Sequence, residues 1–346
     1  MGVRDEIYEQ PEVLQGLLET QRATLLRAAA AIRDRDVRFV LLAARGTSDH
    51  AGVYAQYVWG ARNRLPVALA APSLFSLYAA APRLRDALVV GISQSGQSPD
   101  VVGVIAEGRR QGALTLAVTN DPASPLAGAA DFVLDVRAGA ERAVAATKTY
   151  TAELLSLAAL SAVLSDEGEA LAALERVPAA VRQALTLEPE VERLAQRHQA
   201  MTQAVVLGRG FNYATALEWA LKLKELTYVL ADPYSAADFQ HGPMAIVEPG
   251  FPVLALAPGG AALPEMLSLL RRLAQELRAD VTVLSDADEA LALGGVGALR
   301  LPGGLPEWLT PLVGIIPAQL FCCHLAQAKG LDLEAPRHLR KVTLTR

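Results

Sequence analysis

Cysteine is almost absent from this chain of 346 residues, and its two cysteines, Cys322 and Cys323, are neighbours. Adjacent cysteines provide neither the spaced framework of a disulfide-rich secreted protein nor a Cys-x-x-Cys pair of zinc ligands. The simplest interpretation is two small buried side chains in a reducing compartment. We therefore expect no disulfide and no metal site at these residues.

An excess of charge of either sign is also lacking, since 32 Lys and Arg face 37 Asp and Glu. Nucleic-acid-binding proteins normally carry a clustered basic excess, so the composition does not favour that class of partner. Charged residues make up 20% and hydrophobic residues 52%, which excludes a disordered chain. The length predicts two domains of moderate size.

No N-terminal apolar signal region is visible, because residues 1–7 already carry charges. The longest uncharged stretch, 308–328, has the length of a membrane span, but prolines and polar side chains interrupt it. A second uncharged run, 65–82, is also broken by prolines. We expect buried strands and helices of a soluble cytoplasmic protein that does not enter a membrane.

Short apolar runs alternate with segments of helical length such as 100–112. This alternation is typical of βαβ units with a parallel sheet. The runs are continuously apolar, which predicts a sheet covered by helices on both faces. The runs in the first half are 37–43, 87–92, 114–118 and 132–134.

The second half repeats this plan. Arg45 and Arg209 each follow an apolar run, and Val89 and Val253 lie in the next corresponding runs. The separation along the chain is the same for both pairs. Two landmarks at one offset predict a duplicated α/β domain. We expect each copy to be a flavodoxin-like three-layer sandwich.

The chain is thus divided into five expected parts. Pro178 and Pro189 should break the connection between the two copies into shorter helices. The parts are an N-terminal helical segment (1–35), the first α/β domain (36–165), a helical connection (166–199), the second α/β domain (200–330) and a C-terminal tail (331–346).

A serine-rich loop follows the run 87–92 and leads into a helix. Ligands of such sheets bind beyond the carboxyl ends of the strands, where a helix N-terminus presents N–H groups and a positive dipole end. Ser93, Ser95 and Ser98 would add hydroxyl donors, and Thr47 and Ser48 lie at the equivalent point after the preceding strand. The loop lacks a Walker lysine and the GxGxxG spacing, which favours a sugar phosphate over a nucleotide.

A structural role for these serines is the alternative. Ser98 precedes a proline and suits a helix N-cap, so the hydroxyls could serve only caps and turns. The corresponding loop of the second copy, 257–260, has no hydroxyl. If only one copy binds an anion, it is the first.

Three charged residues share one face of the expected helix 214–229. Glu218, Lys222 and Glu225 are spaced i, i+4 and i+7. Two interpretations stay open: a solvated stripe with a weak ion pair, or a general base beside a lysine in a cleft. His241 follows on a segment fixed by Gly242 and Pro243.

The basic tail 336–346 would ordinarily be solvated and frayed. An apolar alternation of Leu339, Val342 and Leu344 predicts instead that it packs.

Six motifs in order resemble the tandem sugar isomerase (SIS) domains of glucosamine-6-phosphate synthases. The residues of these motifs are more similar still to those of the stand-alone glucosamine-6-phosphate deaminases of SIS type. The resemblance covers nearly the whole chain. The motifs are 44–48, 92–96, 144–148, 216–225, 241–243 and 336–341.

The resemblance implies a role for each matching residue and requires no metal or cofactor. It makes Glu225 the base that moves a proton between C1 and C2, with Lys222 and Glu218 as its neighbours. It makes His241 the ring-opening group, donated by the partner subunit of a homodimer, and Lys341 the lysine that forms a Schiff base in the synthases. The phosphate contacts are Thr47, Ser48, Ser93, Gln94, Ser95 and Ser98, and the sugar contacts are Val144 and Ala146.

The sequence shows no glutaminase half, so we expect deamination: glucosamine 6-phosphate and water give fructose 6-phosphate and ammonia. Alternatives are a deglycase of fructosamine-type phosphates, an isomerase-only homologue of the synthases, and a sugar-phosphate sensor. Ala146 stands where the synthases have serine, and His338 where they have asparagine.

Overall fold

The computed structural model describes residues 2–165, 167–293 and 296–341, which form two compact units. The first-sheet unit comprises Glu9–Glu141, Ala146–Glu175 and the tail from Arg340. The second-sheet unit comprises the chain up to Tyr8, Arg142–Ala145 and Arg176–Leu339.

The first-sheet unit is built on five parallel strands in the order β2-β1-β3-β4-β5. The four predicted strands are confirmed, and β2, which lies in the uncharged run 65–82, is an additional short edge strand. The strands are β1 (Phe39–Ala43), β2 (Val67–Leu69), β3 (Ala87–Ile92), β4 (Leu114–Thr119) and β5 (Phe132–Asp135).

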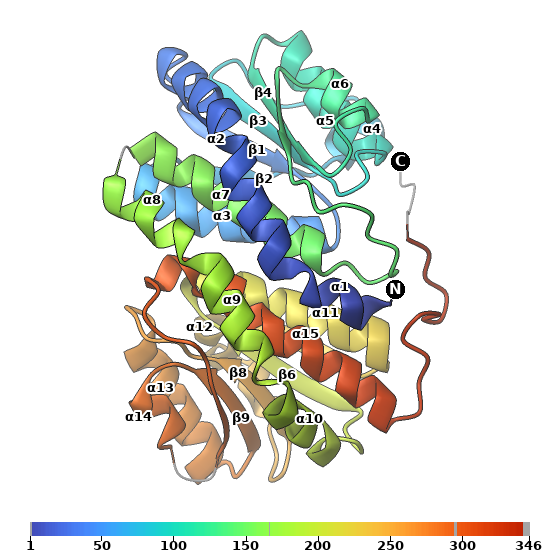
Figure 1. Cartoon of the computed structure of the whole chain (residues 1–346), viewed down its shortest axis with the longest axis vertical. Helices are drawn as coiled ribbons and strands as arrows, with labels where there is room; N and C mark the ends of the chain where they lie inside the picture. Colours follow the sequence, from blue (N-terminus) through green and yellow to red (C-terminus); the bar gives the residue numbers. More distant parts are fainter. Residues whose placement is uncertain (1, 166, 294–295, 342–346) are drawn as a thin grey trace. The chain divides into compact units, whose positions relative to one another are not determined.

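Helices cover both faces of this sheet, as predicted (Figure 1). Side chains of α5 and α6 pack on Val89 and its neighbours on one face. On the other face, Gly52 of α3 lies so close to Leu42 that a Cβ would overlap it, and α3 packs against α7. The helices are α2 (Gln10–Asp34), α3 (Thr47–Asn63), α4 (Ser73–Ser76), α5 (Pro99–Arg110), α6 (Pro125–Ala129), α7 (Lys148–Ser165) and α8 (Gly168–Glu175).

The second sheet, β10-β9-β8-β6-β7, has the same topology when it is followed from its other edge. The register repeats as well: Leu41 pairs with Val89 in the first sheet, and Val205 pairs with Val253 at the same offset in the second. This confirms the predicted duplication. The strands are β6 (Gln203–Gly208), β7 (Leu230–Ser235), β8 (Pro252–Leu256), β9 (Asp280–Ser285) and β10 (Val296–Arg300).

The second sheet is also covered on both faces. Phe239 of α12 and Leu270 of α13 pack on one face, and Gly314 of α15 contacts Leu256 on the other. The α-helices are α1 (Val3–Tyr8), α9 (Val177–Leu185), α10 (Glu188–Arg197), α11 (Tyr213–Thr227), α12 (Ala236–Gln240), α13 (Leu263–Arg271), α14 (Asp288–Leu291) and α15 (Thr310–Ala328). The 3₁₀ turns are Gly210–Asn212, Pro243–Ile246 and Glu307–Leu309, and Arg272–Glu276 is a π-helical turn.

The segment Glu307–Ala328 has the length and hydropathy of a membrane span, but 94% of its most apolar window is buried inside the protein. Cys322 and Cys323 lie on α15 as buried free thiols, and burial raises the pKa of both. The segment is therefore a core helix of the second-sheet unit, as the prolines within it indicated.

The two prolines of the connection act as predicted. Pro178 and Pro189 each occupy the second position of a helix, α9 and α10, where the missing N–H has no intrahelical partner to lose. The connection is therefore a series of short helices.

Candidate functional site

Two loops of the first-sheet unit meet at the carboxyl edge of neighbouring strands. The loop after β1 leads into α3, and the loop after β3 leads into α5. Nε of Arg45, in the first loop, donates to Oδ2 of Asp100 at 2.7 Å, and the Asp100 side chain is fully buried at the start of α5. This ion pair joins the two segments that the sequence assigned to anion binding.

The serine loop is organised by its own hydroxyls. Oγ of Ser93 accepts the N–H of Gly96 at 3.2 Å and lies 3.4 Å from Oγ of Ser98, while Oγ of Ser95 accepts the N–H of Gln97 at 3.3 Å. Ser98 occupies the N-cap position of α5, but its side chain makes no capping hydrogen bond. The N-cap position expected for Ser98 is therefore confirmed, although its hydroxyl bonds no helix amide, and the hydroxyls of Ser93 and Ser95 stabilise turns, as the structural alternative predicts.

Gly96 is the residue that shapes this loop. Its φ is +61°, and an added Cβ would overlap the side chain of Ser124 and lie 3.0 Å from Oγ1 of Thr119. The carbonyl of Gln94 accepts the N–H of Asn120 at 3.0 Å, which ties the loop to the end of β4. The loop is thus held tightly against its neighbour, with space for glycine alone at this position.

Thr47 and Ser48 open α3, as the phosphate-binding prediction requires. Oγ of Ser48 donates to Oε1 of Glu153 on α7 at 2.9 Å, and both side chains are buried. The hydroxyl hydrogen of Ser48 is therefore directed at a protein carboxylate.

The corresponding loop of the second sheet already holds carboxylates. The N–H of Gly259 donates to Oδ1 of Asp286 at 2.7 Å. The N–H groups of Ala261 and Ala262 donate to Oε2 and Oε1 of Glu307 at 2.7 and 3.3 Å. The amides before α13 are thus already bonded to negatively charged groups of the same chain, whereas those of the first loop bond hydroxyls, which agrees with an anion site in the first copy alone.

The charged face of α11 is buried. Glu218 and Lys222 are 0% exposed, and Nζ of Lys222 lies 3.2 Å from Oε1 of Glu218 and 2.5 Å from Oε2 of Glu225. Burial disfavours the Lys222 ammonium, but the two carboxylate charges outweigh it and raise the pKa of Lys222 above its ordinary value. The interpretation as a solvated stripe is therefore wrong.

Glu225 differs from Glu218 and Lys222 because 21% of its side chain is exposed to solvent. A carboxylate that is fixed by a buried ammonium on one side and open on the other has the arrangement of a general base. The structure thus favours the second interpretation of the sequence, a general base beside a lysine.

His241 lies exposed at the end of α12, before Gly242 with φ +131°. Within the described residues of the second-sheet unit, no hydrogen bond or ion pair joins His241 to Glu225. Its assignment to ring opening stays a prediction.

The tail is held by polar contacts. The guanidinium of Arg337 lies 4.4 Å from the ring centroid of Tyr228, and the Arg337 N–H donates to the Tyr228 hydroxyl at 3.0 Å. Leu339 is 40% exposed, so the predicted apolar packing is wrong at this residue. Val342 and Leu344 lie outside the described residues.

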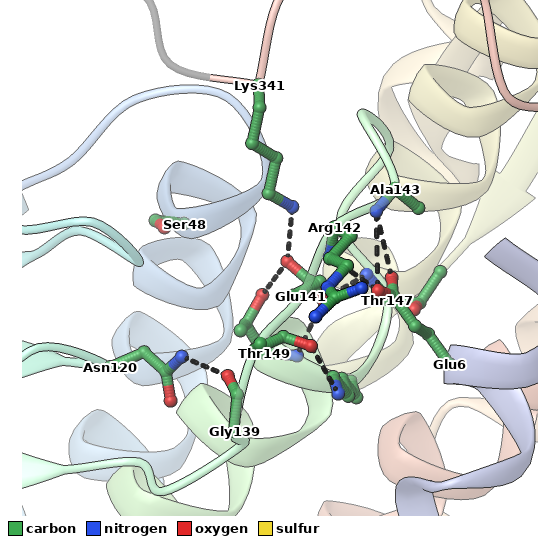
Figure 2. A network of polar contacts seen from close by, with 12 residues as sticks. Glu6, Ser48, Asn120, Gly139, Glu141, Arg142, Ala143, Thr147, Thr149 and Lys341 are labelled. Carbon is green, nitrogen blue, oxygen red and sulfur yellow. Dashed lines mark hydrogen bonds and ion pairs between the residues drawn. The ribbon is translucent and has the colours of Figure 1, made fainter. Parts of the chain in front are cut away.

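Lys341 forms an ion pair that the sequence did not indicate. Its Nζ lies 2.7 Å from Oε2 of Glu141, a carboxylate with no exposed side-chain area (Figure 2). The signal that could have found Glu141 is its place three residues before the motif 144–148. Val144 and Ala146, the predicted sugar contacts of that motif, are half-buried.

The predicted site residues are shared between the two units. The first-sheet unit holds Thr47, Ser48, Ser93, Gln94, Ser95, Ser98, Ala146 and Lys341, and the second-sheet unit holds Val144, Glu218, Lys222, Glu225 and His241. Across the part of the chain that the structure describes, no group of three or more His, Cys, Asp or Glu side chains is suited to hold a metal ion.

Comparison with known families gives two matches to the family model of the SIS domain, over residues 35–163 and 198–327. The glutamine–fructose-6-phosphate aminotransferase [isomerizing] of Aquifex aeolicus (strain VF5) is 37% identical over 97% of this chain and 56% of its own length. The protein of the same name from Xanthomonas campestris is 36% identical, over 98% and 58%. The chain thus spans a little over half the length of these relatives.

Solved structures show the same fold. A protein of Silicibacter pomeroyi DSS-3, provisionally named a phosphosugar isomerase, is 36% identical with a TM-score of 0.85, over 96% of this chain and 99% of its own. The C-terminal domain of the Francisella tularensis glucosamine-fructose-6-phosphate aminotransferase is 27% identical with a TM-score of 0.87, over 96% and 97%. A glucosamine-6-phosphate deaminase of Thermotoga maritima, 21% identical with a TM-score of 0.76 over 99% of both chains, shows the fold alone.

Proposed function

Since the chain belongs to the SIS domain family, we propose that it is a phosphosugar isomerase acting on an amino sugar phosphate. The proposed reaction converts glucosamine 6-phosphate and water into fructose 6-phosphate and ammonia. The observation that carries the proposal is Glu225, a partly exposed carboxylate fixed by the buried Lys222 ammonium. The names of the relatives that are 36% and 37% identical, which are aminotransferases of fructose 6-phosphate, support the choice of sugar.

The serine loop is the proposed phosphate site. A phosphate at the N-terminus of α5 would meet backbone N–H groups of the first helical turn and the hydroxyls of Ser93, Ser95 and Ser98. The α3 N-terminus, with Thr47 and Ser48, opens at the same edge of the sheet. Two helix dipoles would then stabilise the phosphate charge.

Glu225 carries the proposed proton transfer. In the open-chain substrate, the Glu225 carboxylate takes the proton from C2 while the aldehyde oxygen on C1 gains a proton from water, so an enaminol forms across C1 and C2. Glu225 returns its proton to C1, and the nitrogen on C2 loses a proton to water, which leaves an imine at C2. Water adds to this imine, and ammonia leaves with the formation of the ketone. One base thus alternates between adjacent carbons, as an aldose–ketose shift requires.

Ring opening precedes this step and needs a proton shuttle near neutral pH, the role proposed for His241. Lys341 is proposed to act on the carbonyl or imine carbon, as a lysine amine can polarise or trap a carbonyl. We further propose a cytoplasmic homodimer in which His241 serves the partner's site, without a metal or cofactor.

A product assay tests the proposal. The purified protein is incubated with glucosamine 6-phosphate, and ammonia and fructose 6-phosphate are measured in equal amounts over time. Unphosphorylated glucosamine is the control, and its turnover should be negligible because the serine loop would have no charge to bind. Absence of both products from glucosamine 6-phosphate contradicts the deaminase proposal.

An isomerase without loss of nitrogen is the second candidate, because the same Glu225 geometry serves any 1,2-proton shift. The relatives' names include the word isomerizing, which favours this candidate. Interconversion of glucose 6-phosphate and fructose 6-phosphate without ammonia release selects it. Turnover of a phosphorylated fructosamine alone selects a deglycase, and binding without turnover selects a sensor.

A further inference from the structure

Glu141 is a buried carboxylate whose orientation the chain fixes on three sides. Its Oε1 accepts the N–H groups of Thr147 and Thr149 at 3.0 and 3.1 Å, and its Oε2 accepts the Thr149 hydroxyl at 2.8 Å (Figure 2). These donors come from the last residues before α7 and its first turn. The carboxylate therefore has one orientation before any further partner is counted.

The backbone that leads into Glu141 is fixed as well. The amide side chain of Asn120 donates to the carbonyl of Gly139 at 2.7 Å and accepts the N–H of Ala138 at 2.8 Å. Asn120 follows β4, so this segment is anchored to the sheet rather than to the tail.

The fourth donor to Glu141 is Lys341, 200 residues away in the sequence. The Lys341 ammonium lies 2.7 Å from Oε2 of Glu141, and 23% of the Lys341 side chain is exposed to solvent. A lysine has a flexible four-carbon stem, and it takes a single position only where a partner holds it. Glu141 supplies a fixed, charged partner at the end of that stem.

We propose that Glu141 is the positioning residue for Lys341. It holds the amine at the start of the segment that carries the predicted sugar contacts Val144 and Ala146. Glu141 does not touch substrate in this proposal, and it acts only through Lys341. The proposal rests on the proposed function in one respect, that Lys341 acts at the carbonyl carbon of the sugar.

The first test needs no substrate. The whole protein is treated with a limiting amount of an amine-acylating reagent, acetic anhydride, and the rate of modification of each lysine is measured by peptide mass spectrometry. In Glu141→Gln, Lys341 loses its charged partner, and its rate of acylation should rise about 10-fold. An unchanged rate for Lys341 overturns the proposal, because a held amine must become more reactive when it is released.

The matched control is Glu9→Gln. Glu9 pairs with Lys148 in the same unit at 2.5 Å, and the Lys148 side chain is 2% exposed. This variant also removes a carboxylate from a buried lysine, so it reproduces a general loosening of the unit. Lys341 acylation should stay at the wild-type rate, and an increase equal to that of Glu141→Gln contradicts a specific role for Glu141.

The second test uses turnover. In Glu141→Gln, kcat should fall about 10- to 100-fold while KM changes by less than about threefold, because phosphate binding at the serine loop is untouched. A change in KM with kcat unchanged overturns the positioning role. If the wild-type protein turns over none of the sugar phosphates, the proposed function fails, and the acylation experiment still decides the position of Lys341.

Thr149→Val tests the same proposal if Glu141→Gln does not fold. It removes only the hydroxyl that orients Oε2 and keeps both charges of the ion pair. Lys341 acylation should rise by about twofold to fivefold, less than in Glu141→Gln, because the hydroxyl acts on Lys341 only through the orientation of the carboxylate. Wild-type acylation in this variant contradicts the proposed fixed orientation of the carboxylate.

Discussion

Nζ of Lys222 lies 2.5 Å from Oε2 of Glu225 and 3.2 Å from Oε1 of Glu218 on the same face of α11. A single buried ammonium therefore balances a fully buried carboxylate and a partly exposed one. Because Glu218 satisfies the lysine from the inner side, Glu225 is held in place without being enclosed. This asymmetry gives one of two similar glutamates the access that a base requires.

Glu225→Gln should abolish turnover of glucosamine 6-phosphate while retaining its binding. The amide has nearly the shape of the carboxylate but cannot accept a proton, so kcat should fall by about 10²- to 10⁴-fold. Steady-state kinetics measure the loss, and calorimetric titration measures the retained affinity. Wild-type turnover in this variant refutes the role of Glu225.

Ser98→Ala should weaken substrate binding more than catalysis. Its hydroxyl stands at the N-terminus of α5 without a capping bond, so its loss removes one donor to the phosphate. KM should rise about 10-fold, the effect of one hydrogen bond to a charged group, with kcat little changed. Ser76→Ala on α4, whose hydroxyl donates to the carbonyl of Pro72, is the control and should leave KM unchanged.

Gly96→Ala should destabilise the first-sheet unit by about 3 kcal/mol, because it adds backbone strain to an overlap with Ser124. Gly112→Ala is the matched control, since its φ is +81° but its added Cβ meets nothing within 4 Å. It should cost only about 1 kcal/mol. Urea unfolding measures both variants, and equal losses would show that the overlap at position 96 relaxes.

Glu188 should make stability sensitive to acid. The Arg4 side chain, followed by Tyr8 and His324, lowers the pKa of Glu188 from 4.5 to about 2. Since the folded-state pKa is depressed, the stabilisation is complete above pH 4.5 and is lost as pH falls towards 2. After allowance for solvent screening of the half-exposed Arg4, the effect is about 1–2 kcal/mol.

The measurement is the free energy of unfolding between about pH 5 and pH 2. Glu188→Gln should reduce stability at the upper end and flatten the dependence on pH. Glu276→Gln is the control, because the Glu276 pair with Arg272 is exposed and 3.7 Å long. A wild-type slope in Glu188→Gln would contradict the assignment.

The sheet cores could be predicted from the sequence because continuously apolar runs specify strands covered on both faces. The edge strands β2 and β7 could not, although the edge strand β5 was among the predicted runs. β2 has only three residues, and β7 contains Asp232 and Pro233, which the sheet tolerates at an edge because one side of the strand needs no partner. The constant offset between the two halves predicted the duplication correctly, and the register pair Val205–Val253 repeats the pair Leu41–Val89 because duplication preserves pairing.

The charged partners in the site were not predictable in the same way. Ser48 bonds to Glu153, which is 105 residues away in the sequence, and Lys341 bonds to Glu141, which is 200 residues away. Such pairs depend on which helices pack together, and no local spacing encodes that. Helical spacing did predict the triad on α11, since i, i+4 and i+7 positions share a face whatever the tertiary structure.

Glu307 has a consequence for binding stoichiometry. Its carboxylate accepts the amide hydrogens of Ala261 and Ala262, where the first copy of the domain has its serine loop. An internal anion that is tethered to the chain cannot be diluted away, so it competes with free phosphate at a permanently high effective concentration. The duplicated architecture should therefore saturate at one sugar phosphate per chain, and a titration should show a single class of sites despite two copies of the fold.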